Sequence, residues 1–130
     1  MRSMVADLSI LKVASAMAQH AAMRHRVLSE NMANADTPGF KARDIPAFDP
    51  KEALKQARRN AAEGQPFASP VDNLRPFEVE TYESSPNGNT VSVQEQMVSA
   101  TDAQAQHQAA LTIYRKSMDL LRLSVTGRIR

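Results

Sequence analysis

Residues 92–127 read SVQEQMVSATDAQAQHQAALTIYRKSMDLLRLSVTG, and this stretch decides the fold of the chain. It has no Pro or Gly before Gly127, and Ser92 with Glu95 forms the S-x-x-E box that begins a helix. Gly127 is suited to end the helix. At 1.5 Å per residue the helix is roughly 50 Å long, so it needs a partner along its length. Its seam positions alternate at spacings of four and three, as a heptad repeat requires: Val93, Met97, Ala100, Gln104, His107, Leu111, Tyr114, Met118, Leu121 and Val125.

A second helix is predicted near the N-terminus, from Asp7 to Ala35. It ends where residues 36–39 read DTPG, because Pro38 disfavours helix in the residue before it and Gly39 permits a tight turn. Its seam again alternates at three and four: Leu11, Ala14, Ala18, Ala21, His25, Leu28, Met32 and Ala35. The expected fold is therefore dominated by α-helix, with the two long terminal helices packed as an antiparallel coiled-coil hairpin.

The middle of the chain is predicted to be partly irregular. A short helix is expected over residues 51–62, after Asp49-Pro50 and before Gly64. Residues 77–82 alternate like a strand, residues 86–89 read PNGN and form a turn, and residues 90–93 are expected to return as a second strand of a β-hairpin. We expect one structural domain in three segments: 1–45, 46–91 and 92–130.

Composition excludes several classes of protein. The chain has 130 residues, 42% of them hydrophobic and 5% aromatic, and it has no Cys, so disulfide scaffolds, thiolate zinc sites and Cys nucleophiles are excluded. The formal net charge of +2, from 16 basic and 14 acidic residues, does not indicate a nucleic-acid partner.

The N-terminus resembles a secretory signal only in part. An Ala-x-Ala pattern stands at residues 14–16, but Asp7 and Lys12 interrupt the apolar segment, and the run from Leu8 to Leu11 is shorter than the usual ~7–15 residues. We therefore expect no cleaved signal peptide. No segment approaches the ~18 apolar residues of a membrane span.

Residue types capable of catalysis or metal binding do not form a convincing site. His20 and His25 are five residues apart, whereas a helical metal pair needs a spacing of four, and His25 and His107 fall on the predicted seams. Glu78 and Glu80, with Glu83, are expected to be solvated strand charges. No nucleophile-elbow context surrounds the serines. We therefore predict no catalytic residue, no metal, no cofactor and no small-molecule substrate.

The two seams are the most informative feature. Several seam positions are Ala or polar, so an isolated hairpin gains little transfer free energy, at about 0.8 kcal/mol per buried methylene. Methionines on these helices provide adaptable contacts with non-identical partners. The pattern favours helices that also pack against other copies or other proteins. The seam residues on which this prediction rests are Leu11, Leu28, Met32, Met97, Leu111, Tyr114, Met118 and Leu121.

Residues 28–44, LSENMANADTPGFKARD, carry a further signal. They resemble the N-x-A-N-x-x-T-x-G-[FY]-K core of the flagellar axial proteins, which include the rod, hook and hook-associated proteins, and resemble the proximal rod subunits in particular. Residues 87–91, NGNTV, and the helix after them are also similar to this family. Asn87 departs from the family's usual Asp, and Ser92 and Gln94 stand where acidic residues are frequent.

The resemblance implies a structural component of the bacterial flagellar basal-body rod, exported by the flagellar type III apparatus without a cleaved signal. It implies contacts with other copies of the chain, with other rod proteins, with the adaptor between membrane ring and rod, and with the export gate. The motif is then a subunit-contact turn, formed by Asn31, Asn34, Thr37, Pro38, Gly39, Phe40, Lys41 and Arg43. A soluble coiled-coil adaptor protein is the alternative that the seams alone leave open.

Overall fold

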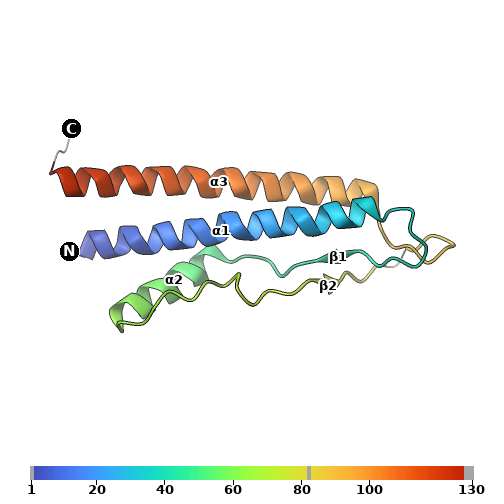
Figure 1. Ribbon diagram of the computed structural model, residues 1–130, viewed down its shortest axis with the longest axis horizontal. Coiled ribbons are helices and arrows are strands. Elements are labelled where there is room, and N and C mark those ends of the chain that lie inside the picture. The colour runs from blue at the N-terminus through green and yellow to red at the C-terminus, as the bar shows by residue number, and fades with distance from the viewer. Residues whose placement is uncertain (1, 82, 128–130) are drawn as a thin grey trace.

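The computed structural model describes residues 2–81 and 83–127. Along the described chain the elements follow in the order α1 (Arg2–Ala33), β1 (Arg43–Asp44), α2 (Pro50–Ala62), β2 (Phe77–Glu78) and α3 (Val93–Thr126). Figure 1 shows α1 and α3 side by side along the length of the molecule, and α2, β1 and β2 on the side of α1 away from α3. The helix α1 is therefore the central element, because it contacts both layers.

The helices α1 and α3 run antiparallel, and both ends of the chain lie at the same end of the molecule (Figure 1). The predicted hairpin of two long terminal helices is thus confirmed. Among the described residues α3 packs only against α1, and it buries side chains seven residues apart. These are Gln96, Ala103, Ala110 and Ser117. Small side chains at a repeat of seven let the helices approach closely while burying little apolar surface.

The ends of α3 form as the sequence predicts. The Ser92 hydroxyl accepts the backbone N–H of Glu95 at 3.4 Å, which satisfies one of the free donors of the first turn. Gly127 follows the last turn with φ of 65°, a left-handed conformation in which a Cβ would be strained. The helix α1 ends at Ala33, two residues before the predicted end, and bonded turns cover residues 34–37.

The short helix α2 is also confirmed, one residue longer than predicted at its start. The Asp49 carboxylate accepts the N–H groups of Lys51 and Glu52 at 3.1 and 3.3 Å, and Pro50 occupies the first helical position, where no N–H is required. Its buried residues Ala53 and Ala57 pack against Val13 of α1. Phe48, Leu54 and Phe67 surround this contact. A small apolar cluster therefore fixes α2 against α1.

The predicted β-hairpin between residues 77–82 and 90–93 is wrong. The strand β2 pairs antiparallel with β1 instead, with Arg43 opposite Glu78 and Asp44 opposite Phe77. The turn at residues 85–89 does form, through hydrogen bonds between Ser85 and Asn89 and between Gly88 and Ser85. Beyond the turn, the N–H of Thr90 donates to the carbonyl of Phe40, and α3 begins at Val93. Residues 90–93 therefore do not form a strand that pairs with β2. Tyr82, the end of the predicted strand, lies outside the described residues.

None of the helices, as far as the chain is described, is both long and apolar enough to cross a membrane.

Candidate functional site

The residues of the motif gather at one end of the hairpin, where α1 ends and α3 begins. Asn31 lies at the centre of this region, which we call the motif junction and define as residues 31–44 together with 85–92. The Asn31 amide nitrogen donates to the carbonyl oxygen of Arg43 at 2.7 Å and to Oε1 of Gln96 at 2.9 Å. Its oxygen accepts the N–H of Arg43 at 3.0 Å. One side chain therefore connects α1, β1 and α3.

Asn31 pairs with the backbone of Arg43 much as a neighbouring strand would. Both hydrogen-bonding groups of Arg43 point toward Asn31, while the carbonyl of Ala42 accepts the N–H of Val79 at 2.9 Å on the opposite side. The short strand β1 thus has a partner on each edge. With 1% exposure, Asn31 acts within the chain and is not accessible to a neighbouring subunit.

The end of α1 is capped by side chains from two segments. The Asn89 amide nitrogen donates to the carbonyl oxygens of Asn34 and Thr37 at 2.8 and 2.7 Å, and its oxygen accepts the N–H of Val91 at 2.8 Å. Asn34 donates to the carbonyl of Glu30 and accepts the Thr37 hydroxyl. Asn34 and Thr37 belong to the turn that follows α1, so the Asn89 side chain holds this turn at the end of the helix.

The loop at residues 85–90 lies directly against the turn. The N–H of Gly39 donates to the carbonyl of Asn87 at 2.9 Å, and Nζ of Lys41 donates to the carbonyl of Gly88 at 3.0 Å. Gly39 and Gly88 have φ of 74° and 82°, and a Cβ on Gly88 would meet the Gly39 Cα at 3.5 Å. Both positions therefore favour glycine through backbone conformation. The resulting pair of loops forms a single hydrogen-bonded surface.

Two ion pairs fasten the junction to α1. The Arg24 guanidinium binds both carboxylate oxygens of Asp44 at 3.1 Å in a bidentate contact, and both side chains are mostly buried. Arg43 donates to Glu30 at 3.2 Å in a more exposed contact. Because Arg24 and Glu30 both lie on α1, the chain that leaves the turn is held along this helix.

The predicted contact residues of the turn divide into two groups. Asn31 is buried, and Asn34, Phe40 and Arg43 are partly buried, so these residues mainly hold the junction together. Four residues lie exposed on its outside: Thr37, Pro38, Gly39 and Lys41. The structure thus separates residues that build the turn from residues that a neighbour can reach.

One of the two lines of the predicted α3 seam is displaced by one residue from the line that is buried, while Ala100, His107 and Leu121 of the other line are partly buried. The buried positions are 96, 103, 110 and 117, whereas the predicted line runs through 97, 104, 111 and 118. Met97 is 58% exposed and Tyr114 is also exposed, as is Met32 on α1. Leu111, Met118 and Leu121 are partly buried, and Leu11 and Leu28 are buried. The large apolar side chains of α3 therefore lie beside the line that contacts α1, and only some of them are partly buried by that contact.

Toward the C-terminus of α3 both flanks of the buried line are apolar. The exposed large apolar side chains of this half are Ile113, Tyr114, Leu120, Leu123 and Val125. Leu8, in the first part of α1, is exposed as well. We call the exposed apolar residues of α3, namely Val93, Met97, Ile113, Tyr114, Leu120, Leu123 and Val125, the α3 stripe. It provides an exposed apolar surface at the start of this helix and over its C-terminal half.

Sequence reasoning missed the role of His20, which is 2% exposed. Its Nε2 lies 2.7 Å from the carbonyl oxygen of Pro46, so Nε2–H donates there, while Nδ1 accepts from the Gln106 amide at 2.9 Å. Gln106 also donates to the carbonyl of Met17 at 3.0 Å. His20 therefore connects α1 to α3 and to the segment before α2. The only available signal was its spacing of seven from Val13 and Val27, which places all three on one face of α1.

The other histidines and the acidic run have a simpler environment. His25 is exposed and His107 partly buried, and both line a shallow pocket between α1 and α3. Among the side chains that the structure describes, no three from His, Asp or Glu gather as a metal site would require. Glu78, Glu80 and Glu83 are exposed.

Comparison with known proteins gives a consistent result. No family model matches the chain. The flagellar basal body rod protein FlgB of Yersinia ruckeri is 31% identical over 103 residues, which cover 71% of this chain and 75% of that protein. FlgB of Aeromonas hydrophila is 40% identical over 81 residues, covering 56% and 59%. FlgB of Escherichia coli (strain K12) is 31% identical over 102 residues, covering 70% and 74%. With such identity over most of its length, the chain belongs to the FlgB family of flagellar basal body rod proteins.

Proposed function

We propose that this chain is a structural subunit of the flagellar basal-body rod and that it packs into the rod through the α3 stripe. The observation that carries the proposal is that α3 buries small or polar side chains against α1 while several of its large apolar side chains remain exposed. A helix that had only α1 to cover would bury its large apolar residues there. In this chain Ala and Ser are buried, while Met97 and Leu120 remain exposed.

The total exposed surface supports the same role. The chain exposes 9095 Å². A compact monomer of this mass exposes about 6,800 Å², so the chain exposes roughly a third more than expected. An elongated hairpin with an apolar flank gains stability when other subunits cover that flank, because burial contributes about 25 cal/mol per Å² of apolar surface.

The proposed partners are copies of this chain, other rod proteins, the adaptor between membrane ring and rod, and the export gate. We place the subunit in the basal body, in the part of the rod that crosses the periplasm, as the family relationship suggests. A structural role of this kind requires neither a catalytic residue nor a cofactor. The soluble coiled-coil adaptor is not favoured, since the curated relatives are rod proteins.

Export without a cleaved signal is part of the proposal. The Ala-x-Ala pattern at residues 14–16 lies inside α1, where Ala14 and Ala16 are buried and Val13 packs against α2. Cleavage after this pattern would remove Val13 and with it the contact that holds α2 against α1. The three segments 1–45, 46–91 and 92–130 are accordingly proposed to act as one unit.

The motif junction is proposed as the second contact surface. Thr37, Pro38 and Lys41 are exposed on a loop pair whose backbone is held by Asn31 and Asn89. A contact loop that is rigid before binding loses less conformational entropy when it docks. The buried side-chain amides of Asn31 and Asn89 therefore fix the conformation of the exposed loop residues.

Complementation of a strain lacking the corresponding gene tests the proposed function. The unsubstituted chain should restore motility and be present in isolated basal bodies. A variant with Met97→Ser and Leu120→Ser should fail to enter basal bodies while its free energy of unfolding changes by less than about 0.5 kcal/mol, since both side chains are exposed. Gln104→Ser, an exposed change on the same helix, is the matched control and should leave assembly unchanged.

Two results would contradict the proposal in different ways. Absence of the unsubstituted chain from basal bodies would refute the role in the rod. Normal incorporation of the Met97→Ser, Leu120→Ser variant would refute the α3 stripe as a contact surface and leave the role in the rod untouched.

A further inference from the structure

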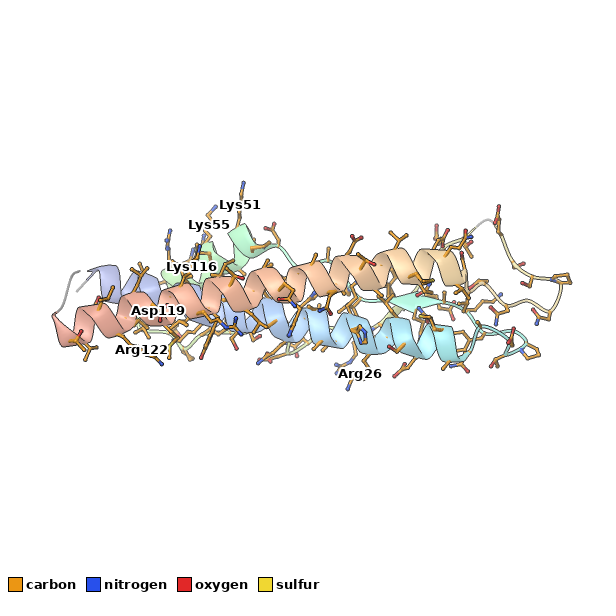
Figure 2. All side chains as sticks on the ribbon, turned by 90° about the horizontal axis from the view of Figure 1, so that it is seen from above. Arg26, Lys51, Lys55, Lys116, Asp119 and Arg122 are labelled. Atoms are coloured by element: carbon orange, nitrogen blue, oxygen red, sulfur yellow. The ribbon has the colours of Figure 1, made fainter. Side chains whose placement is uncertain are left out.

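The outward face of α2 is mainly basic, with the exposed Glu52 at its edge. Ala53 and Ala57 face the core, and Lys51, Lys55 and Arg58 follow one another at spacings of four and three on the opposite side, with Arg59 beside them. All four are exposed. Figure 2 shows Lys51 and Lys55 pointing away from the body of the molecule on the same side. This face, which we call the α2 basic face, has no partner in the described part of the chain.

A complementary segment follows in the same layer of the molecule. Glu78 and Glu80 are exposed on β2 and just beyond it, alternating with the exposed apolar side chains of Phe77 and Val79. No Lys or Arg occurs between Arg75 and Arg115. Arg43 lies opposite Glu78 but donates to Glu30, so the carboxylates of this segment, residues 77–80, form no ion pair within the described part of the chain.

The two surfaces cannot meet within one chain. Figure 1 shows α2 near the end of the molecule that holds the termini, and β2 farther along the axis toward the motif junction. The helix α2 packs against α1, β2 packs against β1, and α2 and β2 do not contact each other. Because both surfaces lie on the same side of α1 but at different positions along it, a second copy must be turned about the long axis to face the first and shifted along that axis. Its segment 77–80 then lies against the α2 basic face of the first copy.

We propose that the α2 basic face binds residues 77–80 of a second copy of this chain. This inference rests on the proposed role as a rod subunit and names one contact within it. The contact joins two different surfaces, so it leaves one of each free at the two ends of any pair. A contact of this kind repeats and forms an open filament or helical layer, whereas a contact of one patch with itself closes as a dimer.

The spacing of the charges fits the proposed contact. Carboxylates two residues apart on a strand are about 6.6 Å apart along the chain, and cations four residues apart on a helix are about 6 Å apart along its axis. Glu78 and Glu80 can therefore face Lys51 and Lys55, or Lys55 and Arg59, at the same time.

Disulfide trapping in assembled basal bodies tests the proposal, and the absence of Cys from the chain makes the background simple. A variant with both Lys55→Cys and Glu80→Cys should form a ladder of linked copies under mild oxidation, because each copy joins the next. Either substitution alone should form no ladder. Lys116→Cys combined with Glu80→Cys is the matched control, since Lys116 lies on α3, which packs on the side of α1 opposite α2 (Figure 1).

Charge reversal provides a second, independent readout. Lys55→Glu and Glu80→Lys should each lower incorporation about fivefold, the equivalent of one exposed ion pair of about 1 kcal/mol. The two together should restore incorporation, because the charges are then exchanged at every contact.

The outcomes of the two experiments distinguish the proposed contact from the proposed function. A ladder with restored incorporation supports the contact. Assembly without a ladder, and with no effect of either reversal, overturns the contact but not the proposed function. Absence of the unsubstituted chain from basal bodies overturns both.

Discussion

Asn31 provides the sharpest test of how the motif junction is held together. Replacing it with Ala removes three hydrogen bonds, to the N–H and C=O of Arg43 and to Oε1 of Gln96. The side chain is 1% exposed, and Gln96 is also buried, so water does not readily replace the lost partner. Each buried polar group left without a partner costs about 1–3 kcal/mol. Because the Arg43 backbone is only partly buried, we expect Asn31→Ala to lower the free energy of unfolding by about 3 kcal/mol.

Urea unfolding followed by circular dichroism measures this change. The midpoint should fall while the slope with urea concentration stays the same, because the change alters stability and not the surface exposed on unfolding. Asn34→Ala is the matched control on the same helix end. It loses one bond to the Glu30 carbonyl and one from Thr37, both near solvent, and should cost less than about 1 kcal/mol. The reasoning is refuted if the free energy of unfolding of Asn31→Ala lies within about 0.5 kcal/mol of that of the unsubstituted chain, since an average substitution already costs about 1 kcal/mol. It is also refuted if the two variants are destabilised equally.

Three further perturbations test other parts of the structure. Ala110→Leu should destabilise the hairpin by about 1–3 kcal/mol through overpacking, because Ala110 is fully buried against α1, whereas the exposed Ala109→Leu should be neutral in the same thermal unfolding experiment. Asp44→Asn should cost about 1 kcal/mol by breaking the bidentate pair with Arg24, and the loss should shrink at high salt if it is electrostatic. Gly88→Ala should cost about 1–2 kcal/mol from its φ of 82°, and an unchanged melting temperature would contradict that assignment.

The sequence was sufficient for the long helices and their caps because these depend on local chemistry. A helix of 34 residues leaves a repeating pattern, and Ser92, Asp49 and Gly127 act on backbone groups within a few residues of themselves. The antiparallel arrangement follows from two such helices joined in one chain. These features required no knowledge of distant contacts.

The pairing of β2 could not be read from the sequence. A strand of alternating residues followed by the turn at 86–89 predicts a local hairpin. The competing partner, β1, is two residues long and lies more than thirty positions earlier in the chain. Its position is set by the Asn31 amide and by the bond from Arg24 to Asp44, both of which act over long sequence separations. The hairpin prediction, which uses only neighbouring residues, therefore fails because Asn31 and Arg24 hold β1 where it can pair with β2.

The sequence by itself determined that two long heptad helices flank an asparagine-rich turn, and so indicated a helical assembly protein. Only the tertiary structure decided which face of α3 is buried, because a heptad pattern with Ala next to large apolar residues can pack on either line. The close approach of α1 selects the line of Ala103, Ala110 and Ser117, since small side chains fit between two nearby backbones. The large apolar side chains are consequently turned outward, where other subunits can bind them.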